Sequence, residues 1–502
     1  MSDAKQTSSG APKAISGIDV MRGVGAQQAK GFWADAWERV LQRKGAVFGI
    51  AWISVVAFFA IFAPVLASAH PVYLERLDAA GAVTAVEWPL VANLTPTDWL
   101  LMIGFAVGVP WTFLGPKSLG RSGRLGVLVV ALLQAGLTIV LAGSIAKWAD
   151  SSSVEWLKQA ARLPSGPWPI VGAVAAVVGL LALIVPTFDA RGPRIATVAG
   201  TALLAATLLL MSGGQKLINF ERYIDDERAG KIRAVWTPVP WSPQYTRSDM
   251  SAIAPGTAVA ENPKLAEFAG TNFGERRNLL GTDALGGDVL AQMMWACRLS
   301  ISIGLVSTGI SLLIGVTIGA IMGYFGGWID LFLFRIVEIF MAVPVLFLLI
   351  VAAGVLPRDT YVMMAIIGCF SWTGAARFTR AEFLKLRKQD FVQAAQATGL
   401  PLRAILFRHM LPNGVTPVLV DASFAIAAAI SVEATLSFLG LGPDGQTSWG
   451  KLLSSATAST GTFVWWLAVF PGLAIFLSVL SYNLLGEALR DAIDPKLRKA
   501  AH

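Results

Sequence analysis

Few ionisable residues of this 502-residue chain stand inside its apolar segments, where they could take part in transport chemistry. Asp421 lies within one such segment, and Glu338 and Glu433 lie near the ends of two others. Buried acids in apolar segments are typical of proton- or ion-coupled transport. Asp421 could therefore line a substrate path as a coupling acid. Its alternative role is a hydrogen bond between two helices, and we favour that simpler interpretation.

Nucleotide and metal chemistry are not supported by the remaining motifs. Residues 445–451 have the glycine and lysine spacing of a phosphate-binding loop, but Leu452 stands where a Ser or Thr would hold Mg²⁺. The histidines, His70, His409 and His502, do not cluster with cysteines or acids, so no metal site is expected. We predict that the chain is not an enzyme, with no catalytic residue and no cofactor of its own.

The basic segment around residues 393–413 indicates a mechanical function instead. Ala394 and Ala395 leave little side-chain bulk, which allows the backbone of a partner to approach closely. Gly399 can take the left-handed conformation that ends a helix, and Pro412 stiffens the start of the next apolar segment. This pattern favours a short helix that docks into a groove on another protein. The alternative is an amphipathic loop that binds lipid.

The elements that position this segment are membrane spans. Hydrophobic residues make up 55% of the chain and charged residues only 14%, and the mean hydropathy is +0.62. Apolar runs of about 18 residues are expected to cross a bilayer as helices. The sequence therefore predicts an all-α polytopic membrane protein. Its ten apolar runs are Ala46–Ser68, Asp98–Leu114, Leu125–Ala146, Trp168–Thr187, Ile195–Met211, Leu299–Tyr324, Ile339–Leu356, Tyr361–Ala376, Val415–Ile430 and Phe463–Leu485.

Loop charge predicts the orientation of these spans. Ten spans place both termini on one side, and cytoplasmic loops are enriched in Lys and Arg. With both termini in the cytoplasm, the basic clusters at 117–124, 191–194 and 377–408 fall inside. This bias, together with attraction to anionic membrane lipids, accounts for a pI near 9.5 without nucleic-acid binding.

Three features indicate how the spans pack and bend. Gly315, Gly319 and Gly323 recur on one helix face, which lets two membrane helices approach closely. Arg335 and Glu338 stand three residues apart, close enough to pair on a helix. Pro344 lacks a backbone donor and can kink a span, either as a gating element or as a static bend.

Five ordered motifs carry a resemblance to a known family. They are Gly281-Thr282-Asp283 with Gly286 and Asp288; Gly323-Tyr324 through Arg335 to Pro344; Ala394, Ala395, Gly399, Leu411 and Pro412; residues 436–442 with Trp449-Gly450; and residues 483–491 through Asp494-Pro495. Together they resemble the second membrane subunit of the dipeptide/oligopeptide ABC-import permeases. The Pro- and aromatic-containing segment before Gly281 inclines the resemblance toward the microcin C and long-peptide branch.

The resemblance implies a type I ABC-importer permease core in a bacterial inner membrane. It also implies a second permease subunit, ATP-binding subunits that carry ATP and Mg²⁺, a periplasmic substrate-binding protein and a peptide substrate. The coupling loop would be formed by Gln393, Ala394, Ala395, Gly399, His409, Leu411 and Pro412. Helix packing and gating would fall to Gly315, Gly319, Gly323, Arg335, Glu338 and Pro344, with Asp421 as a possible pathway residue.

The expected organisation follows from spans and resemblance together. It comprises a cytoplasmic tail with an interfacial amphipathic helix (1–45), a first span (46–68), an extra four-helix membrane block (98–211), a periplasmic segment (213–298), a five-helix permease core (299–490) with coupling loop 377–414, and a cytoplasmic tail (491–502).

The sequence departs from the family pattern at several places. Gln393 stands where the coupling consensus has Glu, Gly287 where the family has Arg, and His409 at a position that is often Ile. The block 98–211 has no counterpart in a usual six-span subunit. Three alternatives therefore stay open: an ion-coupled transporter that uses Asp421, an ABC permease for nickel or a sugar, and a non-transporting scaffold.

Overall fold

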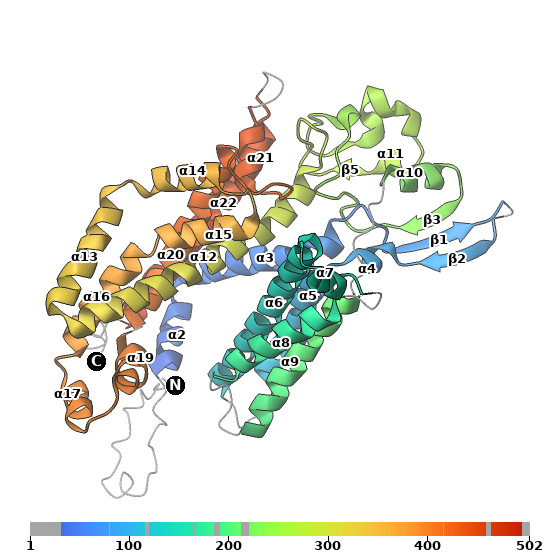
Figure 1. The fold of residues 1–502 in the computed structure, drawn as a ribbon. Coiled ribbons are helices and arrows are strands. Elements are labelled where there is room, and N and C mark those ends of the chain that lie inside the picture. Colours follow the sequence, from blue (N-terminus) through green and yellow to red (C-terminus); the bar gives the residue numbers. More distant parts are fainter. Residues whose placement is uncertain are drawn as a thin grey trace, which may run out of the picture.

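The computed structural model describes residues 32–79, 81–115, 120–163, 167–184, 191–211, 220–414, 416–457 and 463–493. In these ranges seven helices are long and apolar enough to cross a membrane, or nine if each of two bent pairs is one span. A further apolar helix, α8 (Trp168–Ala182), has 15 residues. The predicted class, an all-α polytopic membrane protein, is confirmed (Figure 1).

Four long helices form the centre of the molecule. They are α3 (Lys44–Leu66), α12 (Val289–Phe325), α20 (Thr416–Phe438) and α22 (Trp465–Ile493). Small residues let them pack closely: a Cβ on Gly49 of α3 would lie 2.7 Å from the Ser481 carbonyl oxygen of α22. Further along α3, Ala60 packs with Ala296 of α12 and Ala474 of α22.

Two predicted spans are bent pairs of helices, so their prediction as single helices is wrong. Helices α13 (Gly327–Ala342) and α14 (Val345–Val355) meet at 79°, and α15 (Thr360–Phe370) and α16 (Thr373–Leu386) at 43°. Pro344 is the residue before α14 and cannot donate a helical hydrogen bond, so it separates two helices instead of kinking one. Helix α16 also continues ten residues past the predicted end of its span at Ala376.

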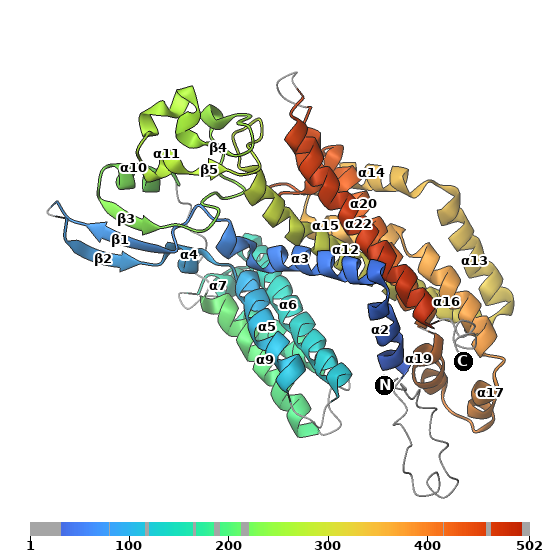
Figure 2. The same cartoon turned by 180° about the vertical axis from the view of Figure 1, so that it is seen from behind.

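The extra block is a separate bundle beside α3. It contains α5 (Pro96–Leu114), α6 (Arg121–Ser151), the short α7 (Glu155–Ala161), α8 and α9 (Arg191–Met211). A buried polar contact ties it together, because Gln134 Nε2 of α6 donates to the Val198 carbonyl of α9 at 2.8 Å. The bundle touches the centre near the end of α3 that is closest to strand β1 (Tyr73–Leu77), and the lower ends of α5 and α9 lie away from the centre (Figures 1 and 2).

A folded domain, the capping domain, lies above the extra block in Figure 1. The sequence predicts only a periplasmic segment, 213–298, in this part of the chain. Its strands β1 (Tyr73–Leu77), β2 (Val83–Glu87) and β3 (Ile232–Val235) form an antiparallel sheet in the order β2-β1-β3. The central strand thus pairs with one strand before the extra block and one after it. The remaining elements are α4 (Pro89–Asn93), α10 (Glu221–Arg228), α11 (Asn272–Glu275), β4 (Thr257–Ala258), β5 (Arg277–Asn278) and three short 3₁₀ turns, Ser248–Met250, Val259–Glu261 and Pro263–Phe268.

The boundary between this domain and the following helix differs from prediction. The core of the domain contains Trp241 and Phe273, both fully buried. Helix α12 begins at Val289, ten residues before the predicted span at Leu299, because Asp288 accepts a hydrogen bond from the Ala291 N–H and so caps the helix there. The predicted periplasmic segment 213–298 therefore includes the first turns of a long helix.

The predicted amphipathic helix is α2 (Phe32–Gln42). Val40 is fully buried, packed with Ala488 and Ala492 of α22, while Trp37 stays exposed. Part of the apolar face is thus covered by protein, and only the rest could meet lipid. Residues 1–31 and 494–502 of the predicted tails lie outside the described residues.

Candidate coupling site

The predicted docking segment folds as a compact unit at the end of α16. It contains α17 (Asp390–Ala397), α18 (Leu402–Ala404), a π-helical turn (Ile405–Met410) and α19 (Leu411–Gly414). Val392 and Ala395 of α17 are buried with Phe383 and Leu386 of α16. The first ten residues of the predicted loop 377–414 are thus helical, and the rest packs on them. The unit lies at the same end as α2 and the last turns of α22 (Figure 2).

Gly399 ends α17 in the conformation that the sequence predicts. Its φ is +73°, and the Leu400 N–H donates to the Ala395 carbonyl at 3.2 Å while the Gly399 N–H donates to the Gln396 carbonyl at 3.0 Å. This pair of bonds is the Schellman arrangement. A Cβ at Gly399 would meet no atom within 4 Å, so this chain imposes only the backbone constraint there.

The structure brings the predicted docking residues together, with different exposure. Gln393, Ala394, Gly399 and Pro412 are exposed, His409 and Leu411 are half-buried, and Ala395 is buried. Large apolar side chains are exposed beside them: Phe391, Leu400, Leu402 and Phe407, the last with 67% of its surface exposed. A short exposed helix with small side chains on a surface rimmed by apolar residues is suited to docking on a protein partner.

The glycine stripe of α12 faces α16. A Cβ on Gly315 would lie 2.6 Å from Ala375 Cβ, and one on Gly323 would lie 2.5 Å from Phe383 Cβ. At Gly319 it would overlap the Ala376 carbonyl oxygen. The two helices therefore touch backbone to backbone along a seam that any larger residue would open.

Other predicted residues are less connected. Arg335 and Glu338 form an ion pair on α13, Nη1 to Oε2 at 2.5 Å, but both side chains are largely exposed. Asp421 of α20 is half-buried, with Oδ2 4.0 Å from where Gly374 of α16 would carry a Cβ. Glu433 of α20 is fully buried, and Ser437 Oγ donates to its Oε1 at 2.7 Å.

Sequence reasoning missed two arginines, Arg380 in α16 and Arg387 directly after the last residue of that helix. Arg380 forms a two-point ion pair with Asp330 of α13, and Arg387 donates to carbonyls at the end of α12. The sequence indicates both only as basic residues of a cytoplasmic loop. Their partners lie about fifty to sixty residues earlier, so no short-range spacing could reveal them.

The Gly281-Thr282-Asp283 motif is a structural cap on α12. Thr282 and Asp283 bind backbone groups of the domain, with Gly287 N–H donating to Asp283 Oδ1 at 2.8 Å. Asp288 accepts hydrogen bonds from Ala291 N–H and Asn278 Nδ2. Burial nevertheless raises the pKa of Asp288 to about 6.

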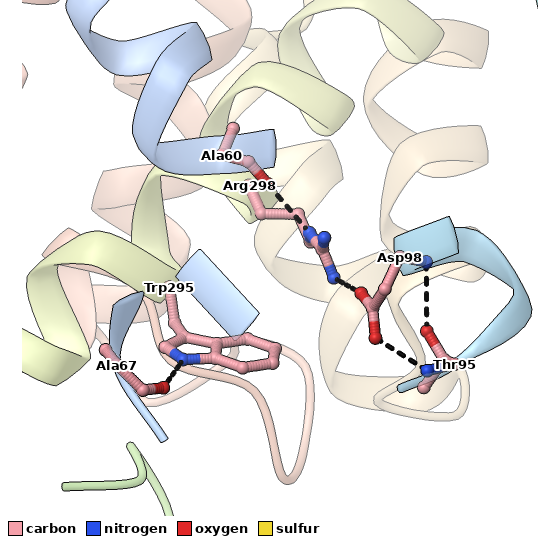
Figure 3. Close-up of polar contacts among 6 residues, drawn as sticks. All are labelled: Ala60, Ala67, Thr95, Asp98, Trp295 and Arg298. Carbon is pink, nitrogen blue, oxygen red and sulfur yellow. Dashed lines mark hydrogen bonds and ion pairs between the residues drawn. The ribbon is translucent and has the colours of Figure 1, made fainter. Parts of the chain in front are cut away.

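A second missed pair joins the extra block to the centre. Arg298 of α12 forms an ion pair with Asp98 of α5, and Arg298 Nε donates to the Ala60 carbonyl of α3 at 3.0 Å (Figure 3). Asp98 is held by its own helix start, since its Oδ2 accepts from the Thr95 N–H at 2.7 Å. One turn earlier on α12, Trp295 Nε1 donates to the Ala67 carbonyl.

This arrangement defines a polytopic membrane protein with a compact helical unit at one end of its spans. Residues 315–499 match the family of binding-protein-dependent transport system inner membrane components, and residues 31–80 match the N-terminal TM domain of oligopeptide transport permease C.

Curated relatives agree with these matches. The chain is 37% identical over 284 residues to a peptidoglycan transport system permease protein, YejE, of Agrobacterium fabrum, which covers 55% of this chain and 74% of the relative. It is 37% identical to an oligopeptide permease, OppC, of Haemophilus influenzae (45% and 72% covered) and 36% identical to a dipeptide permease, DppC, of Alkalihalophilus pseudofirmus (43% and 72%). The chain belongs to this family of ABC transport permeases. It is a transport subunit and not an enzyme.

Proposed function

We propose that this chain is the second permease subunit of an ATP-driven peptide importer and couples to separate ATPase subunits through α17. The observation that carries the proposal is the docking unit: a short helix with exposed alanines, capped by Gly399 and fixed to α16 by a buried apolar cluster. Such a unit transmits a push because it cannot move without α16. The peptide substrate is supported by the oligopeptide and dipeptide relatives.

The proposal assigns a side and partners to each part of the chain. The end with α2, α17 and α19 faces the cytoplasm of a bacterium, where ATP-binding subunits hold ATP and Mg²⁺. The capping domain with β1–β3 faces the periplasm, where a substrate-binding protein delivers peptide. A second permease subunit completes the path through the inner membrane.

The proposed domains follow the described elements. The permease core is α3 with α12–α16, α20 and α22, the coupling unit runs from Arg387 to Gly414, and α5–α9 form an added membrane block. The two family matches, residues 31–80 and 315–499, leave this block between them.

A matched pair of glycine variants tests the coupling role. Gly399 and Gly230 both follow a helix in the left-handed region, with φ +73° and +69°, and both have open space where a Cβ would go. Asp at either site therefore costs about 1–2 kcal/mol of backbone strain. We expect Gly399→Asp to abolish peptide uptake while the protein remains in the membrane, and Gly230→Asp to transport normally.

The partners are tested by purifying the tagged chain from native membranes in mild detergent. Mass spectrometry then identifies the proteins that it retains. The proposal is supported if the wild-type chain retains one other permease with ATP-binding subunits and if this recovery is lost in Gly399→Asp. A chain recovered alone, with uptake that persists without ATP and stops in Asp421→Asn, would replace it with the ion-coupled alternative.

A further inference from the structure

Two arginines, Arg380 of α16 and Arg387 directly after its last residue, hold the turn between α12 and α13 at the coupling end. The turn is formed by Gly326 and Gly327, with φ values of +63° and +53°. Asp330 follows in the first turn of α13. Asp330 and the two arginines are not part of the docking surface. They connect α16, which carries that surface, to α12 and α13.

The first contact is a two-point ion pair. Arg380 Nε lies 2.5 Å from Asp330 Oδ1, and Arg380 Nη2 lies 2.7 Å from Asp330 Oδ2. The side chains are 28% and 14% exposed, and the guanidinium also covers the Phe334 ring at 4.5 Å. A planar guanidinium satisfies all of these contacts at once, whereas a lysine ammonium would keep only one of them.

The second contact caps the long helix α12. Arg387 Nη1 donates to the Tyr324 carbonyl at 3.0 Å and to the Phe325 carbonyl at 3.1 Å. These carbonyls are the negative end of a helix of 37 residues, where a cation is favoured. A Cβ on Gly326 would lie 2.5 Å from this nitrogen, so a side chain there would displace the guanidinium, and the positive φ of Gly326 also favours glycine.

The glycine seam explains why such contacts are needed. A seam of small residues allows close approach, but it has no directional bond that prevents one helix from sliding or turning along the other. The polar contacts at Asp330 and at the end of α12 supply that direction. The coupling helix joins the same group, since Gln396 Nε2 reaches the Tyr324 hydroxyl at 3.4 Å.

We propose that Asp330, Arg380 and Arg387 are positioning residues that make the ends of α12, α13 and α16 one rigid body. A displacement of α17 is then transmitted to α12 and α13, because α16 can no longer slide along α12 at the glycine seam. This inference rests on the proposed function for its transport readout, but the rigid body itself can be tested without transport.

The first test measures peptide imported per ATP hydrolysed by the full complex in liposomes. Asp330→Asn and Arg380→Lys should keep the ATPase subunits bound and hydrolysing while the ratio falls at least tenfold. The charge exchange Asp330→Arg with Arg380→Asp should recover part of it. Glu382→Gln is the control on the same helix, because its pair with Lys385 is more exposed. Wild-type ratios in both single variants, or a loss of transport and hydrolysis in equal proportion with no recovery on exchange, would overturn the proposal.

The second test does not depend on transport. Thr379 is 1% exposed and faces Gly319 in the seam. With Cys297 and Cys369 replaced by Ala, the single substitution Thr379→Cys should react slowly with a maleimide in the wild-type background and at least tenfold faster with Asp330→Asn or Arg387→Gln. Unchanged protection in both variants would refute the rigid body. If the wild-type complex does not couple ATP hydrolysis to peptide import while Thr379→Cys stays protected from maleimide, only the proposed function is refuted.

Discussion

Arg298 and Asp98 form an ion pair that joins α12 of the permease core to α5 of the added block. The Asp98 side chain is 3% exposed and that of Arg298 is 20% exposed. Because Arg298 also binds the Ala60 carbonyl, one guanidinium connects α3, α5 and α12 (Figure 3). The block is therefore attached through a charged contact close to the capping domain.

Removal of Asp98 is expected to destabilise the protein strongly. Asp98→Ala leaves the mostly buried Arg298 charge without its carboxylate and removes the capping partner of Thr95, so a loss of about 3–5 kcal/mol is expected. Thermal unfolding of the purified protein in detergent measures this. Glu87→Gln, which breaks the exposed pair with Arg76, should change stability by less than about 1 kcal/mol. Equal shifts in the two variants would contradict the importance assigned to the ion pair of Asp98 with Arg298.

The added block should be removable. Strand β1 pairs with β2 before the block and with β3 after it. The Leu90 N–H donates to the Pro71 carbonyl at 3.0 Å, and the neighbouring His70 ring lies 5.0 Å from the Phe220 ring, so the chain segments that flank the insertion lie close together. Replacing residues 95–219 by a flexible linker, together with Arg298→Gln to avoid an unpaired charge, should leave a core that still assembles with its partners. Size-exclusion chromatography of the co-expressed complex checks this. Failure to assemble would show that the block is part of the core fold.

The sequence predicts much of this fold because hydrophobic length is a local signal. The spans, the left-handed Gly399 and the close approach at Gly315, Gly319 and Gly323 each depend on residues near one another in the chain. The bent pairs were missed because apolar composition does not record direction. At Pro344 the sequence indicates a break, but not an angle of 79°.

The two ion pairs between helices could not be predicted, since each joins residues that are distant in sequence. Asp98 and Arg298 are 200 positions apart, and Asp330 and Arg380 are 50 apart. The pairing of β1 with β3 could not be predicted either, because it joins strands on the two sides of the whole inserted block. The coupling of the docking residues to an ATPase stays a prediction.

Asp288 should give the capping domain a specific pH dependence. Burial raises its pKa to about 6, above the value near 3.8 expected in the unfolded chain. A raised folded-state pKa means that its stabilising contribution is present below about pH 4 and is lost as the pH rises through about 6. The melting temperature of wild type minus that of Asp288→Asn should therefore be larger at pH 4.5 than at pH 7.5. A difference that grew with pH would show that the hydrogen bonds to Asp288 outweigh its burial.

Two glycines of α12 allow the seam to be tested by a single kind of substitution. A side chain at Gly319 would overlap the backbone of α16 at Ala376, whereas one at Gly309 would meet no atom within 4 Å. Gly→Leu raises helix propensity equally at both sites, by about 0.8–1 kcal/mol. Gly319→Leu must therefore push α16 away, and overpacking of this kind typically costs about 1–3 kcal/mol or more. We expect it to lower the melting temperature and the yield of monodisperse protein, while Gly309→Leu matches or exceeds wild type. A stable Gly319→Leu protein whose Thr379→Cys remains protected from maleimide would mean that α12 and α16 are not in contact along this face.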